Sequence, residues 1–450
     1  MLNRGTFIKM NNLKIAQRCF STGAYNKVPK EYMNEVNYQE DNKAELVLTM
    51  KKQSNFLDTV STIFEKFNCT PIGIDPKPSL MSKDKEAIDL YLDFDKPQED
   101  ISLKNAFKEI KQIHGFLNIS DILTVPWFPQ TISDFDQYNR ILRLGDGIEQ
   151  SEHIAFEDEE YVKRRNYISE VASEYKMDDP ELPHIEYNEN EKKTWNICYG
   201  NIKNLYERGA CKEFTEAFAM FEKYCGVSEN DIPQLDHISR WLKPITGWRV
   251  RPVGGLLSQR EYMNGLAFKI FHCTQFLRHH SDPEFSPEPD GVHEILGHTP
   301  MLFNKEFSDF SQKIGLASLG CTDHQLSILA AIYIYTVEFG MCMDEGKKKA
   351  YGAAILTSIG EFEWAISGKP PYLPFDWAEI AENYLDYLMA SVQPYYFLAE
   401  SFADAKDKIN DYVDNMERPF YSVYNEEDEV IEIDRKVRIS KREKDPVYRK

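Results

Sequence analysis

Between residues 45 and 124 the spacing of hydrophobic positions changes several times, and the order of these changes predicts a small mixed module. Hydrophobic residues alternate with polar ones in a half-buried strand, whereas in an amphipathic helix they recur every three or four positions. Strand-like spacing occurs at 46–50, 72–74, 88–94 and 116–123, and helix-like spacing at 56–67 and 103–113. The order strand, helix, strand, strand, helix, strand is that of a ferredoxin-like fold.

The chain beyond this module has a mostly helical pattern. A polar, acidic stretch from 146 to 190 is typical of a linker followed by an exposed helix, and helical spacing then continues to about residue 413. The segment 326–342 is apolar nearly all round, which predicts a helix buried in the middle of a domain.

Near the end of the chain, residues 421–424 and 430–433 have the pattern of two short strands. We therefore predict an α+β protein of three parts. These are a ferredoxin-like module at 44–124, a mostly α-helical domain at 125–418, and a short strand pair with a charged tail at 419–450.

Charge and hydropathy restrict the partners of the chain. Its 450 residues include 53 basic and 73 acidic ones, which gives a net charge of −20. Such a surface repels phosphate groups, so no nucleic-acid partner is expected. The longest apolar run, 328–335, is far shorter than the about 20 residues that a membrane helix needs, so no membrane partner is expected. The eight cysteines form no C-x-x-C pair, which argues against a zinc ribbon or a redox motif.

Residues 1–30 differ from the rest in composition. They contain six basic residues and no acidic one, which is typical of a mitochondrial transit peptide. A basic tail without a targeting role has the same composition, so the sequence leaves a mitochondrial and a cytoplasmic location open.

The segment Pro287–His298 contains His293 and His298 in the pattern H-E-x-x-x-H. Zinc proteases use H-E-x-x-H, because residues four apart lie within about 40° of each other on a helix. A spacing of five separates the side chains by about 140° on an ideal helix, so this pair shares a metal only at a helix end or bulge. Gly297 tolerates such a distorted turn. The spacing disfavours a protease.

Glu338 is the candidate third ligand. It lies within the apolar segment 326–342, where an unpaired carboxylate is costly. Two imidazoles and one carboxylate form the facial triad of non-haem Fe(II) oxygenases, which leaves positions open for oxygen and substrate. Three protein ligands with an open position also suit catalytic zinc, so the residues predict a metal site and leave its metal open.

Several segments around these residues closely resemble the pterin-dependent aromatic amino acid hydroxylase family. The segments are Val125–Pro129, Arg251–Ser258, Phe271–Gln275, Pro287–His298, Phe310–Gly320, Thr336–Gly340 and Ala350–Ala353. The resemblance extends from about residue 45 to 434. It implies a monooxygenase whose metal is Fe(II), bound by His293, His298 and Glu338, with tetrahydrobiopterin and O₂ as cosubstrates.

The resemblance also assigns the cofactor site. The pterin is expected along residues 253–263, with Glu294 and Tyr333 as the catalytic residues that face it from the other side. The expected cofactor-binding residues are Val253, Gly255, Leu256, Leu257, Ser258, Tyr262, Met263, His272, Glu294, Ala330 and Tyr333.

The substrate expected from the resemblance is a small aromatic amino acid, L-phenylalanine, which would be converted to L-tyrosine in phenylalanine catabolism. Arg278 matches the residue that binds the substrate carboxylate in the family, because a guanidinium group can donate two hydrogen bonds to one carboxylate. Thr357 is expected to form a hydrogen bond with His293. Ile334 replaces the Trp or Phe of relatives, and Met389 replaces the Asp of tyrosine hydroxylases. The expected substrate-binding residues are Arg278, Ser286, Pro289, Ile334, Phe339, Thr357 and Met389.

Several alternatives accompany this interpretation. Space beside Ile334 would admit an indole, so a tryptophan or mixed-specificity hydroxylase is the second hypothesis. An amino-acid sensor with an inactive catalytic domain is disfavoured by the presence of all three ligands, and a zinc hydrolase by the histidine spacing.

The module at 44–124 resembles the ACT regulatory domain of the family. Residues 55–57 and 74–78 replace the motifs with which animal phenylalanine hydroxylases bind activating phenylalanine, so allosteric activation is left open. The family's long leucine-rich helix is missing after 430–433, so a dimer or monomer is expected rather than a tetramer.

Overall fold

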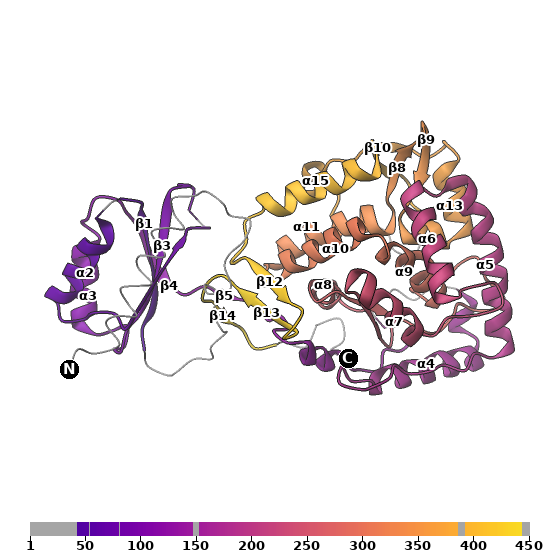
Figure 1. Cartoon of the computed structure of the whole chain (residues 1–450), viewed down its shortest axis with the longest axis horizontal. Coiled ribbons are helices and arrows are strands. Elements are labelled where there is room, and N and C mark those ends of the chain that lie inside the picture. The colour runs from indigo at the N-terminus through magenta and orange to yellow at the C-terminus, as the bar shows by residue number, and fades with distance from the viewer. Residues whose placement is uncertain (1–42, 54, 81, 147–152, 386–391, 443–450) are drawn as a thin grey trace. The chain divides into compact units, whose positions relative to one another are not determined.

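The computed structural model describes residues 43–442 except 54, 81, 147–152 and 386–391 (Figure 1). The expected transit peptide at 1–30 and the expected substrate residue Met389 lie outside the described residues. Contacts divide the chain into two units, and each is described by itself. The first contains the chain up to Pro126 with residues 417–423 and 432–441, and the second contains 127–416, 424–431 and the chain from 442 onward.

The first unit is built on a four-stranded antiparallel sheet, in which the strands follow the order β2-β3-β1-β4. The elements are β1 (Glu45–Lys51), α2 (Phe56–Lys66), β2 (Gly73–Pro78), β3 (Ala87–Asp93), α3 (Ile101–Ile110) and β4 (Phe116–Asp121). Both helices cover the same face of the sheet (Figure 1), where Leu48 and Leu90 are fully buried. The predicted ferredoxin-like order is confirmed.

A segment from the end of the chain, Asp434–Ile439, completes the first unit, and we call it the C-terminal strap. Its Arg435, which is 2% exposed, donates to the carbonyl of Pro78 at 3.1 Å. Lys436 forms an ion pair with Asp93 at 3.0 Å. The strap ends in β14 (Arg438–Ile439), which pairs in parallel with β5 (Thr124–Val125). Residues far apart in the sequence therefore build one unit.

The second unit is mostly helical. Its helices of at least seven residues are α4 (Glu159–Glu174), α5 (Glu189–Gly209), α6 (Lys212–Cys225), α7 (Leu235–Thr246), α8 (Gln259–Ala267), α10 (Lys305–Ser318), α11 (Asp323–Tyr333), α13 (Ile359–Ile366), α14 (Trp377–Asn383) and α15 (Phe402–Asn415), with a 3₁₀ helix, η2, of that length at Ile132–Tyr138. Shorter helical segments are η3 (Ile154–Phe156), α9 (Thr299–Leu302) and α12 (Ala353–Thr357). No helix in the described part of the chain combines the length and the hydropathy needed to cross a membrane.

Short strands complete this unit. A four-stranded sheet has the order β10 (Tyr372–Pro374), β11 (Tyr396–Ala399), β8 (Met341–Asp344) and β9 (Lys347–Ala350). A parallel ribbon joins β6 (Arg249–Pro252) to β7 (Ile270–Cys273). The predicted strand pair near the end of the chain is confirmed as β12 (Ser422–Asn425) and β13 (Val430–Ile433), whose residues are divided between the two units.

Two segments differ from the prediction. The helix expected over 326–342 ends at Tyr333, continues as a π-helical turn to Glu338 and gives way to β8 at Met341. Helix α4, expected to be exposed, buries one face because Arg165, 1% exposed, binds Glu288 within the domain. The π-helical turn and the buried face of α4 leave the spacing of hydrophobic residues unchanged, so that spacing could not predict either of them.

Candidate metal centre

Two π-helical turns carry the three candidate ligands. His293 and His298 begin and end the turn η4 (His293–His298), and Glu338 ends the turn η5 (Ile334–Glu338). In a π turn the backbone N–H bonds to the carbonyl five residues earlier, as Phe339 does to Ile334 at 2.8 Å. Residues five apart then lie on one face. The distorted helix predicted from the histidine spacing is confirmed.

The ligand atoms lie at the corners of a small triangle. His293 Nε2 is 3.0 Å from His298 Nε2, His298 Nε2 is 3.1 Å from Glu338 Oε1, and His293 Nε2 is 3.4 Å from Glu338 Oε2. Adjacent ligands of an octahedral ion with bonds of about 2.1 Å are about 3.0 Å apart. Glu338 Oε2 is buried without a hydrogen-bond partner among the described residues. The three groups fit one face of a single ion.

Hydrogen bonds fix the protonation of His293. The Thr357 hydroxyl donates to the carbonyl of Ala353 at 2.7 Å, so its oxygen accepts from His293 Nδ1 at 3.1 Å. Nδ1 therefore carries the proton and Nε2 presents its lone pair to the metal. Burial lowers the pKa of His293 to about 4, which keeps the imidazole neutral.

Glu338 is held in its ionised form. Burial raises the pKa of this carboxyl, but its interactions with His298, which include a hydrogen bond, and with His293 outweigh burial and leave the pKa below its ordinary value. Neutral imidazoles and an ionised carboxylate are the forms that bind a divalent metal.

Helix α12 packs so closely against both ligand-bearing turns that a side chain at Gly297 or Gly352 would overlap its neighbours. A Cβ at Gly297 would lie 2.9 Å from Ala353 Cβ and 3.0 Å from Thr357 Cγ2, and a Cβ at Gly352 would overlap the carbonyl of Glu338. Gly297 has no left-handed φ. The glycine is thus required for close packing and not for the conformational freedom that the sequence suggested.

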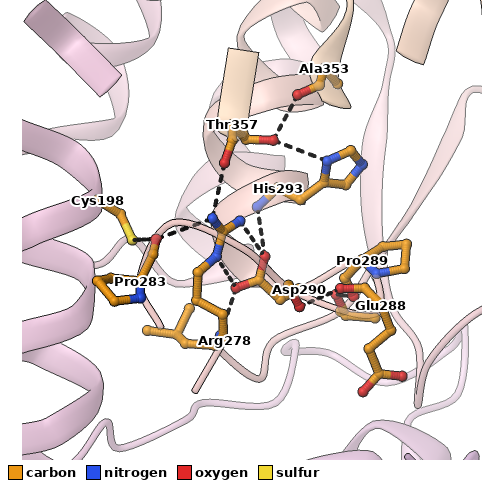
Figure 2. Close-up of polar contacts among 12 residues, drawn as sticks. Cys198, Arg278, Pro283, Glu288, Pro289, Asp290, His293, Ala353 and Thr357 are labelled. Carbon is orange, nitrogen blue, oxygen red and sulfur yellow. Dashed lines mark hydrogen bonds and ion pairs between the residues drawn. The ribbon is translucent and has the colours of Figure 1, made fainter. Parts of the chain in front are cut away.

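Arg278 and Asp290 form a buried pair next to His293 (Figure 2). Arg278 donates Nε and Nη2 to the two Asp290 oxygens at 3.1 and 2.9 Å, and Nη1 to the Thr357 carbonyl at 2.9 Å. Asp290 Oδ1 also accepts from the His293 backbone at 3.1 Å. The bidentate contact expected for a substrate carboxylate is thus made to Asp290, and it links Arg278 to the first residue of η4.

Two tyrosines and a carboxyl lie on the expected cofactor side. The hydroxyls of Tyr262 and Tyr333 are 2.9 Å apart, and their ring centroids are 5.5 Å apart. Glu294 is 6% exposed, and its Oε2 has no hydrogen-bond partner among the described residues. Burial, with repulsion from Glu338 and Asp290, raises the pKa of Glu294 well above its ordinary value. A buried carboxyl with an unused oxygen suits a polar heterocycle.

The structure separates His272 from this group. Phe271, its neighbour on β7, lies 5.2 Å from the His298 ring between centroids. Successive side chains of a strand point to opposite faces, and His272 accordingly contacts Phe135 and Tyr138 at 5.7 and 6.0 Å. The expected contact between His272 and the cofactor stays a prediction.

The other expected cofactor residues lie in and around α8 and α11. Ser258 caps α8 by accepting from the backbone of Glu261. Val253 and Leu257 pack on Leu142, and a Cβ at Gly255 would lie 2.7 Å from Arg165 Nη2. The remaining members are Leu256 in the loop before α8, Met263 on α8 and Ala330 on α11.

The other expected substrate residues lie in two segments of the chain, one that contains Glu338 and one that precedes His293. Ile334 begins the η5 turn, and Phe339 follows Glu338 at its end. The Ser286 hydroxyl donates to the carbonyl of Glu288 at 2.6 Å, and the Pro289 carbonyl accepts from Thr274 at 3.0 Å.

Sequence reasoning missed Asp290 and the pair Arg165–Glu288. Asp290 is fully buried, and both side chains of the ion pair are at most 2% exposed. Asp290 could have been identified from the sequence, because it is an acidic residue in the same segment as the two histidines. The partner of Glu288 lies 123 residues away, and no local pattern identifies it.

Comparison with known proteins agrees with this geometry. A family model described as biopterin-dependent aromatic amino acid hydroxylase matches residues 126–445. The phenylalanine-4-hydroxylase of Rattus norvegicus is 39% identical over 428 residues, which cover 93% of this chain and 94% of the relative.

Relatives named for other substrates are similar to the same degree. The tryptophan 5-hydroxylase of Xenopus laevis is 38% identical over 419 residues, 90% of this chain and 85% of its own length. The tyrosine 3-monooxygenase of Mus musculus is 40% identical over 359 residues, 80% of this chain and 71% of its own length. Identity alone therefore does not select one aromatic amino acid.

Proposed function

Because this chain belongs to the biopterin-dependent aromatic amino acid hydroxylase family, we propose that it converts L-phenylalanine to L-tyrosine. The family uses iron and biopterin, and the triad of His293, His298 and Glu338 fits the iron site. When bound, iron and tetrahydropterin supply the activated oxygen for ring hydroxylation. The substrate class, an aromatic amino acid, follows from the family, and phenylalanine is the finer proposal.

The carboxylate end of the substrate is proposed to meet Arg278. Among the described residues, Asp290, the Thr357 carbonyl and the Pro283 carbonyl take four of the five guanidinium hydrogens. One Nη2 hydrogen is left for a ligand. Asp290 fixes the plane of the guanidinium, so this hydrogen has a defined direction before the substrate binds.

The ring end of the substrate is proposed to meet apolar side chains. Ile334, 8% exposed, and Phe339, 6% exposed, flank Glu338 in the chain and carry no polar side-chain group. An apolar environment suits a phenyl ring better than a phenol, whose hydroxyl would need a hydrogen-bond partner. This absence of a polar selector at Ile334 and Phe339 is the observation on which the choice of phenylalanine rests.

A product assay tests the proposal. Purified protein with Fe(II), tetrahydrobiopterin and O₂ is given phenylalanine, tyrosine or tryptophan, and products are separated by chromatography. We expect the highest kcat/KM for phenylalanine with tyrosine as the product. His293→Ala is the control, because loss of one ligand should remove both iron and turnover.

A tryptophan hydroxylase is the second candidate, and the side chain at 334 favours it. An isoleucine leaves more room than a tryptophan would, and a larger ring system needs that room. A higher kcat/KM for tryptophan, with a hydroxytryptophan as the product, would replace phenylalanine with this candidate. Ile334→Trp should then reduce tryptophan turnover more than phenylalanine turnover.

A further inference from the structure

Arg442, near the end of the described chain, binds within the catalytic unit. Its Nη2 donates to Glu261 Oε1 at 2.8 Å and its Nη1 to the carbonyl of Gln137 at 2.9 Å. The guanidinium carbon lies 5.3 Å from the Trp127 ring centroid and 5.0 Å from that of Tyr138. Two hydrogen bonds and two aromatic contacts thus fix the position of this side chain.

Glu261 is the buried centre of a cluster with two guanidinium groups. It is 6% exposed, and Arg140 donates to both of its oxygens at 2.7 and 2.5 Å. Burial raises the pKa of Glu261, but Arg140 and Arg442 outweigh burial and leave the pKa below its ordinary value. The carboxylate is therefore ionised and attracted from two directions.

The Glu261 carboxylate also holds the first turn of α8. The hydroxyl of Ser258, the N-cap of this helix, donates to Glu261 Oε2 at 3.2 Å. The backbone N–H of Glu261 donates to the same hydroxyl oxygen at 3.4 Å. The next residue, Tyr262, makes the 2.9 Å contact with Tyr333. Any shift of Glu261 therefore moves the capping residue and Tyr262 together.

The loop before α8 has the same support. A Cβ at Gly254 would lie 3.0 Å from the Arg140 carbonyl and 3.1 Å from the Leu142 backbone nitrogen. Arg140 thus contacts this loop through its backbone and Glu261 through its side chain. The segment 253–263 is therefore supported by Arg140 and, through Glu261, by Arg442.

We propose that Arg442 is a positioning residue for the pterin-binding segment 253–263 and acts through Glu261. This proposal rests on the proposed function, because that segment is expected to bind the pterin from its resemblance to the family. Arg442 contacts Glu261 and not the ligand, so its effect is on the geometry of the segment. Its loss should weaken pterin binding and leave the metal ligands and Arg278 in place.

The variant Arg442→Ala is expected to fold, because Arg140 keeps Glu261 paired. The lost contacts are the charge-assisted hydrogen bond to Glu261, the hydrogen bond to Gln137 and the contacts with Trp127 and Tyr138, all made by a side chain that is 23% exposed. We expect pterin affinity to fall by about three- to tenfold, as suits a partly exposed ion pair. Arg442→Lys keeps the charge and should recover part of this loss. Lys441→Ala, a neighbouring exposed lysine, is the matched control.

Three measurements test the proposal on the full chain. Calorimetry gives the Kd of 7,8-dihydrobiopterin, steady-state kinetics gives KM for tetrahydrobiopterin and for the amino acid, and amide hydrogen exchange follows residues 258–267. In Arg442→Ala we expect a higher Kd and a higher pterin KM, with faster exchange in 258–267. Iron content and the KM for the amino acid should equal those of the wild type.

The outcomes separate the two proposals. Wild-type protein that binds no pterin would overturn both. Wild-type protein that binds pterin, with an Arg442→Ala variant that binds it within twofold as well, would overturn the role of Arg442 alone. Faster exchange without a change in pterin affinity would also overturn it, since Arg442 would then only stabilise the helix.

Discussion

Thr357 serves two residues of different function at once. Its hydroxyl oxygen accepts from His293 and its backbone carbonyl accepts from Arg278. The orientation of a metal ligand and the orientation of the proposed carboxylate-binding residue therefore depend on one short helix. A substitution of Thr357 removes the hydroxyl that contacts His293 and keeps the carbonyl that contacts Arg278. The metal ligand and the proposed carboxylate-binding residue can therefore be tested separately at this position.

Thr357→Val should weaken iron binding by about 10- to 100-fold, because His293 Nδ1 loses the acceptor that fixes its tautomer. Thr357→Ser keeps the hydroxyl and is the matched control. Iron affinity is measured by competition with a chelator that has a known affinity for Fe(II). Equal affinities in the valine and serine variants would show that the hydroxyl does not orient His293.

Asp290→Ala should destabilise the fold by about 3–5 kcal/mol, because it leaves the Arg278 cation buried and unpaired. Asp309→Ala is the control, since Asp309 forms an exposed ion pair with Lys305 and its loss should change little. Urea unfolding of the iron-free proteins gives both values. A loss of less than about 1 kcal/mol in Asp290→Ala would mean that water or another residue compensates for the missing carboxylate.

Site residues could be predicted from the sequence where a polar or ionisable side chain stands out from the residues around it. Glu338 was found because a carboxylate in an apolar segment requires a partner, and the histidines because of their spacing. The partners of Arg278 and of Arg165 were not found, since an arginine near a polar segment has many plausible acids. Only the fold selects Asp290 and Glu288 from them.

At the scale of elements, the two π turns and α12 form one packed group. Each turn gains one residue relative to an α-helix, which directs its ligands inward. The glycines Gly297 and Gly352 allow α12 to approach both turns. The group explains why three ligands from two distant segments reach one ion.

Gly352→Ala should displace Glu338, because its Cβ would overlap the Glu338 carbonyl. We expect lower iron content and a loss of stability of more than about 2 kcal/mol, since backbone atoms cannot rotate away. The control is Gly360→Ala in α13, where a Cβ meets no atom within 4 Å. There alanine should stabilise the fold by about 0.5–1 kcal/mol. Similar effects in both variants would contradict the packing argument.

Element prediction succeeded for the strands of the first unit. The strands β1 and β3 form where alternation predicted them, but burial is not confined to one face, because Thr49 and Asp89 are buried as well as Leu48 and Leu90. Prediction failed at Tyr333, where α11 becomes a π turn without a change in hydropathy. A shift in hydrogen bonding by one residue leaves the pattern of apolar positions intact, so periodicity cannot detect it.

At the scale of the whole molecule, the neutral state of His293 links stability to pH. Burial lowers the pKa of His293 from 6.5 to about 4, so between these values the unfolded chain binds a proton that the folded iron-free protein does not. Stability therefore falls as pH is lowered through this range. We expect a contribution of about 2 kcal/mol between pH 7 and 5, measured by urea unfolding. His293→Gln should lose this part of the pH dependence, and an unchanged dependence would refute the assignment.

The C-terminal strap has a consequence for how the protein is made. Lys436 and its partner Asp93 are 343 residues apart in the sequence. The strands β1–β4 therefore leave the ribosome long before the strap that contacts them has been synthesised. At about 5–20 residues per second, synthesis of the intervening chain takes about 20–70 seconds. During that time Asp89 lacks the ion pair that Arg435 later forms with it at 3.9 Å. The nascent N-terminal module therefore stays incomplete until the strap at residues 434–439 has been made.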